Sequence, residues 1–343
     1  MIDPHVHLRD WNESYKETIL HGLETAWECG IDVLFDMPNT SPALTGRESV
    51  LRRIEDGRKA TEELYRRGKK VEYHIYLGLT SDENQIKEMV DLHNELFPSV
   101  IGLKLFASHS TGNMGIIEEE DQKKVWSTLS SLDYRGVVAV HSEKTSYFTS
   151  APSHYASRPQ ESEIESIRDQ IRFATDSSFK GTLHIAHIST SGALSLVKEA
   201  KEKGEIRITA GATAHHALLN YSSENQILRM NPPLRSEEDR LSIFNGLLTG
   251  DIDWIESDHA PHTLQDKMEG KCGIPGFEGT LLLIEELRRN GIKEERLSAL
   301  LSSNISSAFG IEESKIGVPA ITEEMKKKAA SAYPFSPWAS RKR

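Results

Sequence analysis

Short apolar runs alternate with helix-like segments along almost the whole chain. The runs are rich in β-branched and other apolar residues and lie at 2–7, 31–37, 71–79, 101–106, 137–141, 182–188, 206–210 and 252–257. Helix-like segments between them include 15–29, 48–67, 83–96, 161–175 and 191–203. Strands that alternate with helices form parallel βαβ units. Eight such runs in one chain predict a (β/α)8 barrel rather than an open sheet.

The chain of 343 residues is long enough for one such barrel, which typically needs about 250 residues. We expect the barrel to occupy residues 1–318, and the segment 319–343, which lacks a clear strand pattern, to form a C-terminal tail. Two long polar connections, 142–160 and 260–280, follow the fifth and eighth runs. Both leave the C-terminal ends of strands, where barrel enzymes carry their active sites.

Charge and composition exclude several classes of function. The chain has 41 Lys and Arg residues against 52 Asp and Glu residues, a net charge of −11, which disfavours nucleic-acid binding. Its apolar runs are shorter than the ~20 residues of a membrane-spanning helix, and its start lacks the features of a secretory signal. Cys29 and Cys272 form no Cys-x-x-Cys pair, and the sequence contains no nucleotide-binding glycine loop. We therefore expect a cytoplasmic protein.

The first run contains the strongest local motif, Asp-Pro-His-Val-His-Leu-Arg at residues 3–9. Alternate residues of a strand point to the same face, so His5, His7 and Arg9 should project together near the C-terminal end of the first strand. Two imidazoles on one face suit zinc, which commonly binds histidine nitrogens. A single His-x-His pair also arises by chance on exposed strands, so this motif needs further support.

Further histidines end the fifth and sixth runs. His141 closes Val-Val-Ala-Val-His, and His187 ends Leu-His-Ile-Ala-His. Each alone could be a core histidine with a structural hydrogen bond, but four histidines at three strand ends favour a metal site. His184 differs in parity from His187, so we expect it to face the helices and to have a structural role.

Lys104 and Asp258 add charged groups at two other strand ends. Lys104 lies within the apolar run 101–106, where a lysine is costly unless it is paired or neutralised. Either the run ends early and the ammonium reaches water, or the lysine has lost its charge, as it would in a carbamate able to bridge two cations. Asp258 supplies a carboxylate that can bind a metal and transfer a proton.

Together these residues resemble the amidohydrolase superfamily and, within it, the dihydroorotases, over residues 3 to about 307. The resemblance implies a zinc-dependent enzyme that interconverts dihydroorotate and N-carbamoyl-aspartate in pyrimidine biosynthesis. In this family a carboxylated lysine bridges two zinc ions, and the strand-eight aspartate is catalytic. The implied ligands here are His5, His7 and Asp258 for one zinc, His141 and His187 for the other, and Lys104 for both.

The resemblance also implies substrate-binding residues. Arg9, Asn39 in Met-Pro-Asn-Thr, and His262 correspond to the residues that hold the substrate carboxylate. An arginine offers a planar fork for a carboxylate, whereas Pro-Asn on its own would indicate only a turn. Contacts to the substrate ring are implied for Asn231 and for the backbone at Pro275 and Gly276.

Two features leave alternatives open. The small polar segment 107–115 either forms a lid that contacts substrate through Ser110 or Thr111, or is an ordinary turn. His215 and His216 either support the metal site or are structural. Because the first run starts at residue 2, the chain resembles the short-form members, which lack a β-sandwich domain. The resemblance further implies a homodimer, and it allows an association with aspartate transcarbamoylase.

Two other functions are weighed against this interpretation. Dihydropyrimidinases and allantoinases share the metal ligands, but their substrates are neutral and have no carboxylate that Arg9 could bind. A non-catalytic relative that serves as a structural partner of aspartate transcarbamoylase would lack metal ligands, whereas this sequence has every expected ligand.

Overall fold

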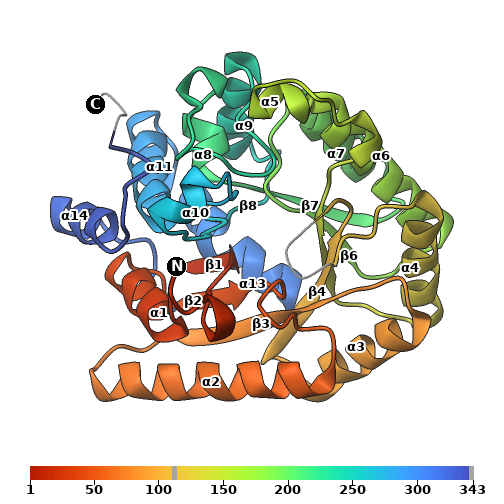
Figure 1. Ribbon diagram of the computed structural model, residues 1–343, viewed down its shortest axis with the longest axis horizontal. Helices are drawn as coiled ribbons and strands as arrows, with labels where there is room; N and C mark the ends of the chain where they lie inside the picture. Colours follow the sequence, from red (N-terminus) through yellow and green to blue (C-terminus); the bar gives the residue numbers. More distant parts are fainter. Residues whose placement is uncertain (110–113, 340–343) are drawn as a thin grey trace.

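A computed structural model describes residues 1–109 and 114–339, and within them eight parallel strands form one barrel (Figure 1). The strands are β1 (Ile2–Val6), β2 (Val33–Asp36), β3 (Glu72–Gly78), β4 (Val100–Phe106), β5 (Val137–His141), β6 (Thr182–Ile185), β7 (Arg207–Ala212) and β8 (Trp254–Ile255). Each strand pairs with the next along the chain. The barrel closes where Val6 bridges His259 and the His7 amide donates to the His259 carbonyl at 2.7 Å. The predicted (β/α)8 barrel is confirmed.

Helices surround the strands on the outside of the barrel (Figure 1). The longer ones are α1 (Ile19–Glu28), α2 (Arg47–Arg66), α3 (Glu83–Leu96), α4 (Glu119–Ser131), α6 (Gln160–Asp176), α7 (Ser191–Lys203), α9 (Glu237–Thr249), α11 (Phe277–Arg289) and α14 (Glu323–Ser331). The shorter ones are α5 (His154–Ser157), α8 (Ala214–Leu218), α10 (Leu264–Met268), α12 (Glu294–Ser298) and α13 (Asn304–Phe309). The predicted helical segments 83–96 and 191–203 coincide with α3 and α7, and the other three overlap α1, α2 and α6.

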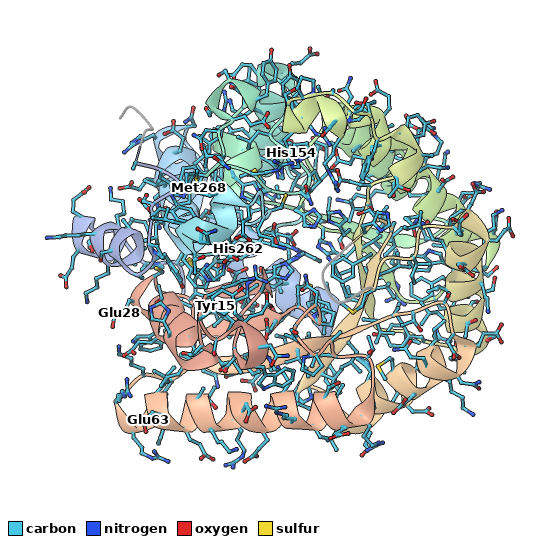
Figure 2. The ribbon with its side chains drawn as sticks, viewed as in Figure 1. Tyr15, Glu28, Glu63, His154, His262 and Met268 are labelled. Carbon is cyan, nitrogen blue, oxygen red and sulfur yellow. The ribbon has the colours of Figure 1, made fainter. Side chains whose placement is uncertain are left out.

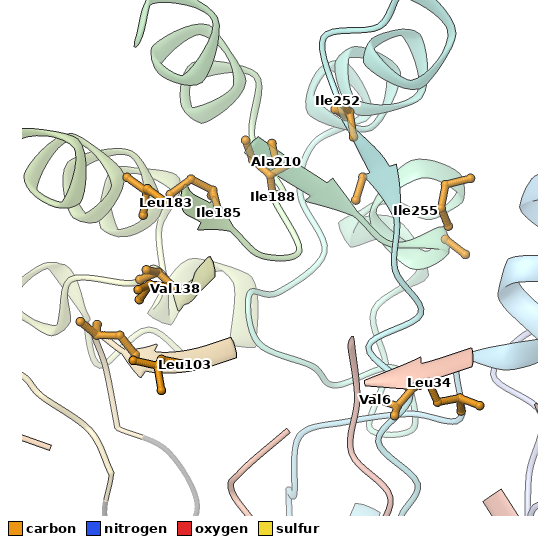
Figure 3. Close-up of a cluster of buried hydrophobic side chains, with 14 of the residues drawn as sticks. Val6, Leu34, Leu103, Val138, Leu183, Ile185, Ile188, Ala210, Ile252 and Ile255 are labelled. Carbon is orange, nitrogen blue, oxygen red and sulfur yellow. The ribbon is translucent and has the colours of Figure 1, made fainter. Parts of the chain in front are cut away.

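Apolar side chains fill both sides of the strands. Outward-facing residues such as Leu103, Val138 and Leu183 pack in the layer between strands and helices (Figure 3). Inside the barrel, Phe35, Tyr76 and Trp254 form a second cluster with Phe309 of α13. The barrel interior around this cluster is therefore a packed core, and the polar side chains of the interior gather at the C-terminal ends of the strands.

The prediction that His184 faces the helices is wrong. β6 ends at Ile185, and His187 has a φ of 39°, so the alternation of the strand does not extend to His187. The His184 side chain lies inside the barrel, where its ring centre is 4.3 Å from that of Trp254 and its Nε2 is 3.1 Å from Glu256 Oε2. Both histidines therefore face the interior.

The segment after the barrel packs onto it. α14 contacts α1 and α11 (Figure 1). Tyr333 is buried and donates to Glu17 at 2.6 Å, and Trp338 covers Gly279, where a Cβ would lie 2.3 Å from the indole ring. The division between residues 318 and 319 stays a prediction. Of the helices in the described part of the chain, none has the length and apolar character that crossing a membrane requires.

Candidate active site

A cavity of about 390 Å³ lies at the C-terminal ends of the strands and receives all six predicted metal ligands. It is lined by His5, His7, Arg9, Glu13, Lys16, Asn39, Lys104, Phe106, His109, His141, His187, Asn231, Asp258, Ala260, His262 and residues 270–273. Figure 2 shows His262 and His154 toward the centre of the molecule, whereas Glu28 and Glu63 lie at its periphery. The barrel thus brings together residues that are up to 268 positions apart in the sequence, from His5 to Gly273.

His5, His7 and Asp258 form the first cluster, with ligand atoms within 4.8 Å of one another. The Nε2 atoms of His7 and His5 lie 3.0 and 3.5 Å from Asp258 Oδ1. His7 Nδ1 lies 2.6 Å from Asn39 Oδ1, and because that oxygen can only accept, the ring proton belongs on Nδ1. The lone pair of His7 Nε2 then faces a carboxylate oxygen, an arrangement that a cation between the two atoms would stabilise.

His141 and His187 form the second cluster, in which His141 Nδ1 lies 3.2 Å from His187 Nε2. His141 Nε2 donates to Glu143 at 2.9 Å, because a carboxylate can only accept, so the lone pair of the ring is on Nδ1. Glu143 is buried and pairs with Arg158. The ring centres of His187 and His5 are 5.2 Å apart, so the two clusters adjoin.

Lys104 lies in the middle of β4 and is 0% exposed, because the strand continues to Phe106. The alternative in which the ammonium reaches water is therefore excluded. Among the residues that the structure describes, Lys104 Nζ has no hydrogen-bond partner. Burial lowers the pKa of Lys104 to about 8, although the negative charges of Glu256 and Asp258 act to raise it. A buried amine without a partner, close to two carboxylates, indicates that a further group belongs beside it.

Burial also keeps the imidazoles neutral. Burial, and then the charge of Lys104, lower the pKa of His5 to about 4. Burial lowers the pKa of His141 and brings that of His187 well below its ordinary value. Burial acts to raise the pKa of Asp258, but its interactions with the His7 and His5 rings outweigh this effect, and the pKa lies below its ordinary value. Neutral imidazoles and an ionised carboxylate are the forms that bind a metal cation.

Glu256 adjoins both clusters, although the sequence pattern does not predict a role for it or for Glu143. Its Oε1 accepts the His187 amide and lies 3.5 Å from His5 Nδ1. Gly211 leaves room for this carboxylate, because a Cβ there would lie 2.4 Å from Glu256 Oε2. The signal that could have found it is a glutamate two residues before Asp258, together with a glycine, Gly211, in the preceding strand.

Arg9 and His262, the predicted carboxylate-binding residues, lie side by side. Arg9 Nη2 is 3.2 Å from His262 Nε2. His262 Nε2 is also 3.0 Å from the Cys272 carbonyl oxygen, to which it can only donate, so it cannot also accept from Arg9. Burial, and then the charge of Arg9, lower the pKa of His262 below its ordinary value. The guanidinium therefore keeps an unused donor for an anion in the cavity.

A buried ion pair fixes the backbone that carries Arg9. Arg53 of α2 and Asp36 of β2 are both 0% exposed and lie 2.6 Å apart. Arg53 Nη1 donates to the Arg9 carbonyl at 2.8 Å, and Asp36 Oδ1 accepts the Leu8 amide at 2.9 Å. The pair thus determines where the chain leaves β1 and where the Arg9 side chain starts.

Of the other predicted substrate-binding residues, some line the cavity and some do not. Asn231 lines the cavity, and its Oδ1 accepts from His154 Nε2 at 2.9 Å, which leaves its amide NH2 as a donor. Pro275 and Gly276 are not among the described residues that line the cavity, and the Gly276 amide donates to His259 Nδ1 at 3.1 Å. Ser110 and Thr111, the predicted lid contacts, lie outside the described residues.

His215 and His216 lie in α8, and neither is among the described residues that line the cavity. His216 Nε2 donates to the Pro232 carbonyl at 3.0 Å, and its Nδ1 lies 2.9 Å from Thr213 Oγ1. These bonds occupy both ring nitrogens and give His216 a structural role. His215 is 1% exposed and packs against it, with ring centres 4.4 Å apart.

Similarity to known proteins was found in sequence and in structure. The chain is 33% identical to the dihydroorotase of Pyrococcus furiosus over 315 residues, which cover 91% of this chain and 66% of that protein. It is 32% identical to the Pyrococcus horikoshii dihydroorotase over 353 residues, or 98% and 74% of the two chains. The Archaeoglobus fulgidus dihydroorotase is 33% identical over 318 residues, or 90% and 71%. The chain belongs to the dihydroorotase family.

Solved structures agree with this family at the level of the fold. L-hydantoinase (dihydropyrimidinase) from Arthrobacter aurescens superimposes with a TM-score of 0.78 at 20% identity and covers 93% of this chain and 72% of its own. A dihydroorotase from Saccharomyces cerevisiae in complex with 5-fluoroorotic acid gives 0.73 at 17% identity, with 92% and 85% covered. No family model matches the chain. The resemblance to the dihydroorotase family that the sequence indicates is confirmed, and the family implies a metal cofactor.

The hydrogen bond between Glu143 and His141 generates the first prediction. We expect Glu143→Gln to weaken the binding of divalent metal by about 10–100-fold, because the amide no longer fixes the proton of His141 on Nε2. Competition with a chromogenic chelator measures the affinity. Glu161→Gln, at an exposed position of α6, is the matched control and should bind metal like the unchanged protein. Equal affinities in the two variants would contradict the role given to Glu143.

Proposed function

We propose that this chain catalyses the reversible hydrolysis of dihydroorotate to N-carbamoyl-aspartate, the dihydroorotase reaction. The observation that carries the proposal is a single cavity that holds two histidine clusters and a buried lysine at one end and Arg9 and His262 at the other. The first set suits metal-assisted amide hydrolysis, and the second suits a substrate with a carboxylate. The names of the relatives at 32–33% identity support the same activity.

We further propose that two zinc ions bind at the clusters. His5, His7 and Asp258 would hold one ion, and His141 and His187 would hold the other. The residues fit this role because burial lowers the pKa of His5 and of His141, the lone pair of His7 Nε2 faces Asp258, and that of His141 Nδ1 faces His187. Six ligand groups drawn from imidazole, carboxylate and a modified amine are a donor set that zinc accepts.

Lys104 would join the two ions as a carbamate. Its neutral amine would attack the carbon of CO2: an N–C bond forms, one C=O electron pair moves to that oxygen, and the nitrogen gives one proton to a water molecule. The pKa of about 8 makes the neutral amine accessible near neutral pH. Once Nζ carries a carboxylate, its two oxygens would be available as metal ligands. The lack of any hydrogen-bond partner for Nζ among the described residues supports this assignment.

The chain's own residues supply binding and proton transfer. When bound, the divalent ions act as Lewis acids that polarise the ring carbonyl and lower the pKa of water. Asp258, which faces His5 and His7, would take a proton from the attacking water and return it to the leaving amide nitrogen. Arg9 and the amide of Asn39 bind the exocyclic carboxylate and so fix the position of the ring. Ring closure uses the same groups in reverse.

The alternatives fit the cavity less well. A neutral dihydropyrimidine or hydantoin ring would leave the Arg9 guanidinium, which is 6% exposed, with only the more distant Glu13 carboxylate at 3.8 Å among the described residues. A non-catalytic scaffold would not need six potential ligands facing one cavity. Homodimer formation, association with aspartate transcarbamoylase, a cytoplasmic location and a place in pyrimidine biosynthesis stay predictions, and sedimentation of the purified chain with and without aspartate transcarbamoylase tests the first two.

Lys104 provides a test of the metal bridge. We expect Lys104→Ala to lose turnover and to retain less metal than the ~2 divalent ions per chain of the unchanged protein, because the bridge is absent. Short carboxylic acids such as acetate should restore part of both. Lys124→Ala, which changes a largely exposed lysine of α4, is the control. Metal content from plasma emission spectroscopy, equal in the two variants and accompanied by full turnover, would disprove the bridge.

Arg9 provides a test of substrate choice. We expect Arg9→Met to lower kcat/KM for dihydroorotate by about 10–100-fold, the scale of a lost charged hydrogen bond of roughly 1.5–3 kcal/mol, with metal content unchanged. Hydrolysis of dihydrouracil, which has no carboxylate, should not fall. Arg66→Met, at an exposed position of α2, serves as the control. Intact dihydroorotate kinetics in Arg9→Met, or faster hydrolysis of dihydrouracil by the unchanged protein, would favour a dihydropyrimidinase instead.

A further inference from the structure

Lys267 is a second buried lysine, outside the proposed metal site. It lies in α10 and is 0% exposed. Its Nζ donates to three backbone carbonyl oxygens, those of Arg229 at 2.8 Å, Lys271 at 2.9 Å and Gly273 at 2.8 Å. An ammonium has three N–H donors, and here each has an acceptor. A buried charge is costly unless it is satisfied in this way, so the three carbonyls and the lysine fix one another.

The three carbonyls belong to two segments of the cavity wall. Arg229 is two residues before Asn231, whose side chain lines the cavity, and residues 270–273 form the wall beside it. The Gly273 amide also donates to the Arg229 carbonyl at 2.9 Å, so the two segments run side by side. Gly273 has a φ of 126°, and a Cβ there would lie 2.8 Å from Ala260, so the wall can take this course only with glycine at that position.

The same wall receives His262. The Cys272 carbonyl lies between the two carbonyls of residues 271 and 273 that bind Lys267, and it accepts from His262 Nε2 at 3.0 Å. The short helix that carries Lys267 is itself fixed by a capping box, in which Thr263 and Asp266 exchange hydrogen bonds between side chain and backbone. Lys267 thus connects a rigid helix to both segments that orient Asn231 and His262.

We propose that Lys267 is a positioning residue for substrate binding: its ammonium clamps the wall 270–273 to the segment that carries Asn231 and so sets the positions of Asn231 and His262. This inference rests on the proposed function only in that the ligand is dihydroorotate. The three carbonyls accept all the hydrogen bonds of the ammonium but carry no negative charge to neutralise it. Lys267 therefore also adds positive charge near the cavity end where Arg9 lies, and this charge favours an anionic ligand.

The clamp should depend on pH. Burial lowers the pKa of Lys267 to about 8, with Cys272 and Asp266 acting to raise it and Arg229 and Arg9 acting to lower it. A neutral amine has two N–H donors and a lone pair, so above this pKa one of the three carbonyls loses its donor and faces that lone pair. The wall is then clamped at low and neutral pH and is released as the pH rises through about 8.

The test compares Lys267→Met, which keeps the length of the side chain and removes its donors, with Gln265→Met, an exposed change in the same helix. For Lys267→Met we expect the KM for dihydroorotate to rise about 10-fold or more with kcat changed far less, because charged hydrogen bonds that hold the binding wall are lost. Metal content should be unchanged. Amides 270–273 should exchange with deuterium faster than in the control, without any ligand present.

The pH profile separates this role from a merely structural one. In the unchanged protein KM should rise between pH 7 and pH 9, and in Lys267→Met this rise should be absent. A flat KM profile in the unchanged protein would overturn the proposal even if Lys267→Met fails to fold, and so would an unchanged KM or unchanged exchange in a folded Lys267→Met. Lack of dihydroorotate turnover by the unchanged protein would instead refute the proposed function, and the exchange experiment would still decide on the clamp.

Discussion

The burial of Lys104 in the wall of the barrel is the constraint on which the rest of the site depends. An amine in an apolar strand, away from water, costs free energy unless neighbouring groups compensate it. Here Glu256 and Asp258 lie close enough to act on its charge, and the nearby imidazoles are held neutral by burial. Among the described residues Lys104 Nζ has no hydrogen-bond partner, and the proposed cations and lysine carbamate would resolve this imbalance.

Hydrogen bonds around the ligands decide which atom each ligand presents. Asn39 holds the proton of His7 on Nδ1, and Glu143 holds that of His141 on Nε2, so one imidazole presents Nε2 and the other Nδ1. The Arg53–Asp36 pair fixes the chain at Leu8 and Arg9 in the same way. The proposed metal binding and substrate binding would therefore rest on one rigid framework at the ends of β1, β2 and β5.

The sequence predicts the fold and most of the site because both follow from local patterns. The spacing of His5, His7 and Arg9 predicts that they meet, and they do line one cavity although β1 ends at Val6, and apolar runs locate every strand. His184 was misplaced because the positive φ of His187 breaks the period of two, which no composition pattern reveals. Glu256 was missed because its partners His184 and His5 lie on other strands, which only the closed barrel brings together. Glu143 was missed although its partner His141 is only two residues away, because it lies beyond the apolar run that ends at His141. The backbone at Pro275 and Gly276 is predicted to contact the substrate ring, and this stays a prediction, although the Gly276 N–H donates to His259.

The central claim is a centre of two metal ions held by residues from five strand ends. Anomalous diffraction at the zinc edge, from crystals grown with added Zn²⁺ and bicarbonate, tests it most directly. The account predicts two anomalous peaks, one beside His5, His7 and Asp258 and one beside His141 and His187, with density that extends from Lys104 Nζ to both. A fully active crystal form with one peak or none, and with Lys104 ending in a plain ammonium, would contradict it.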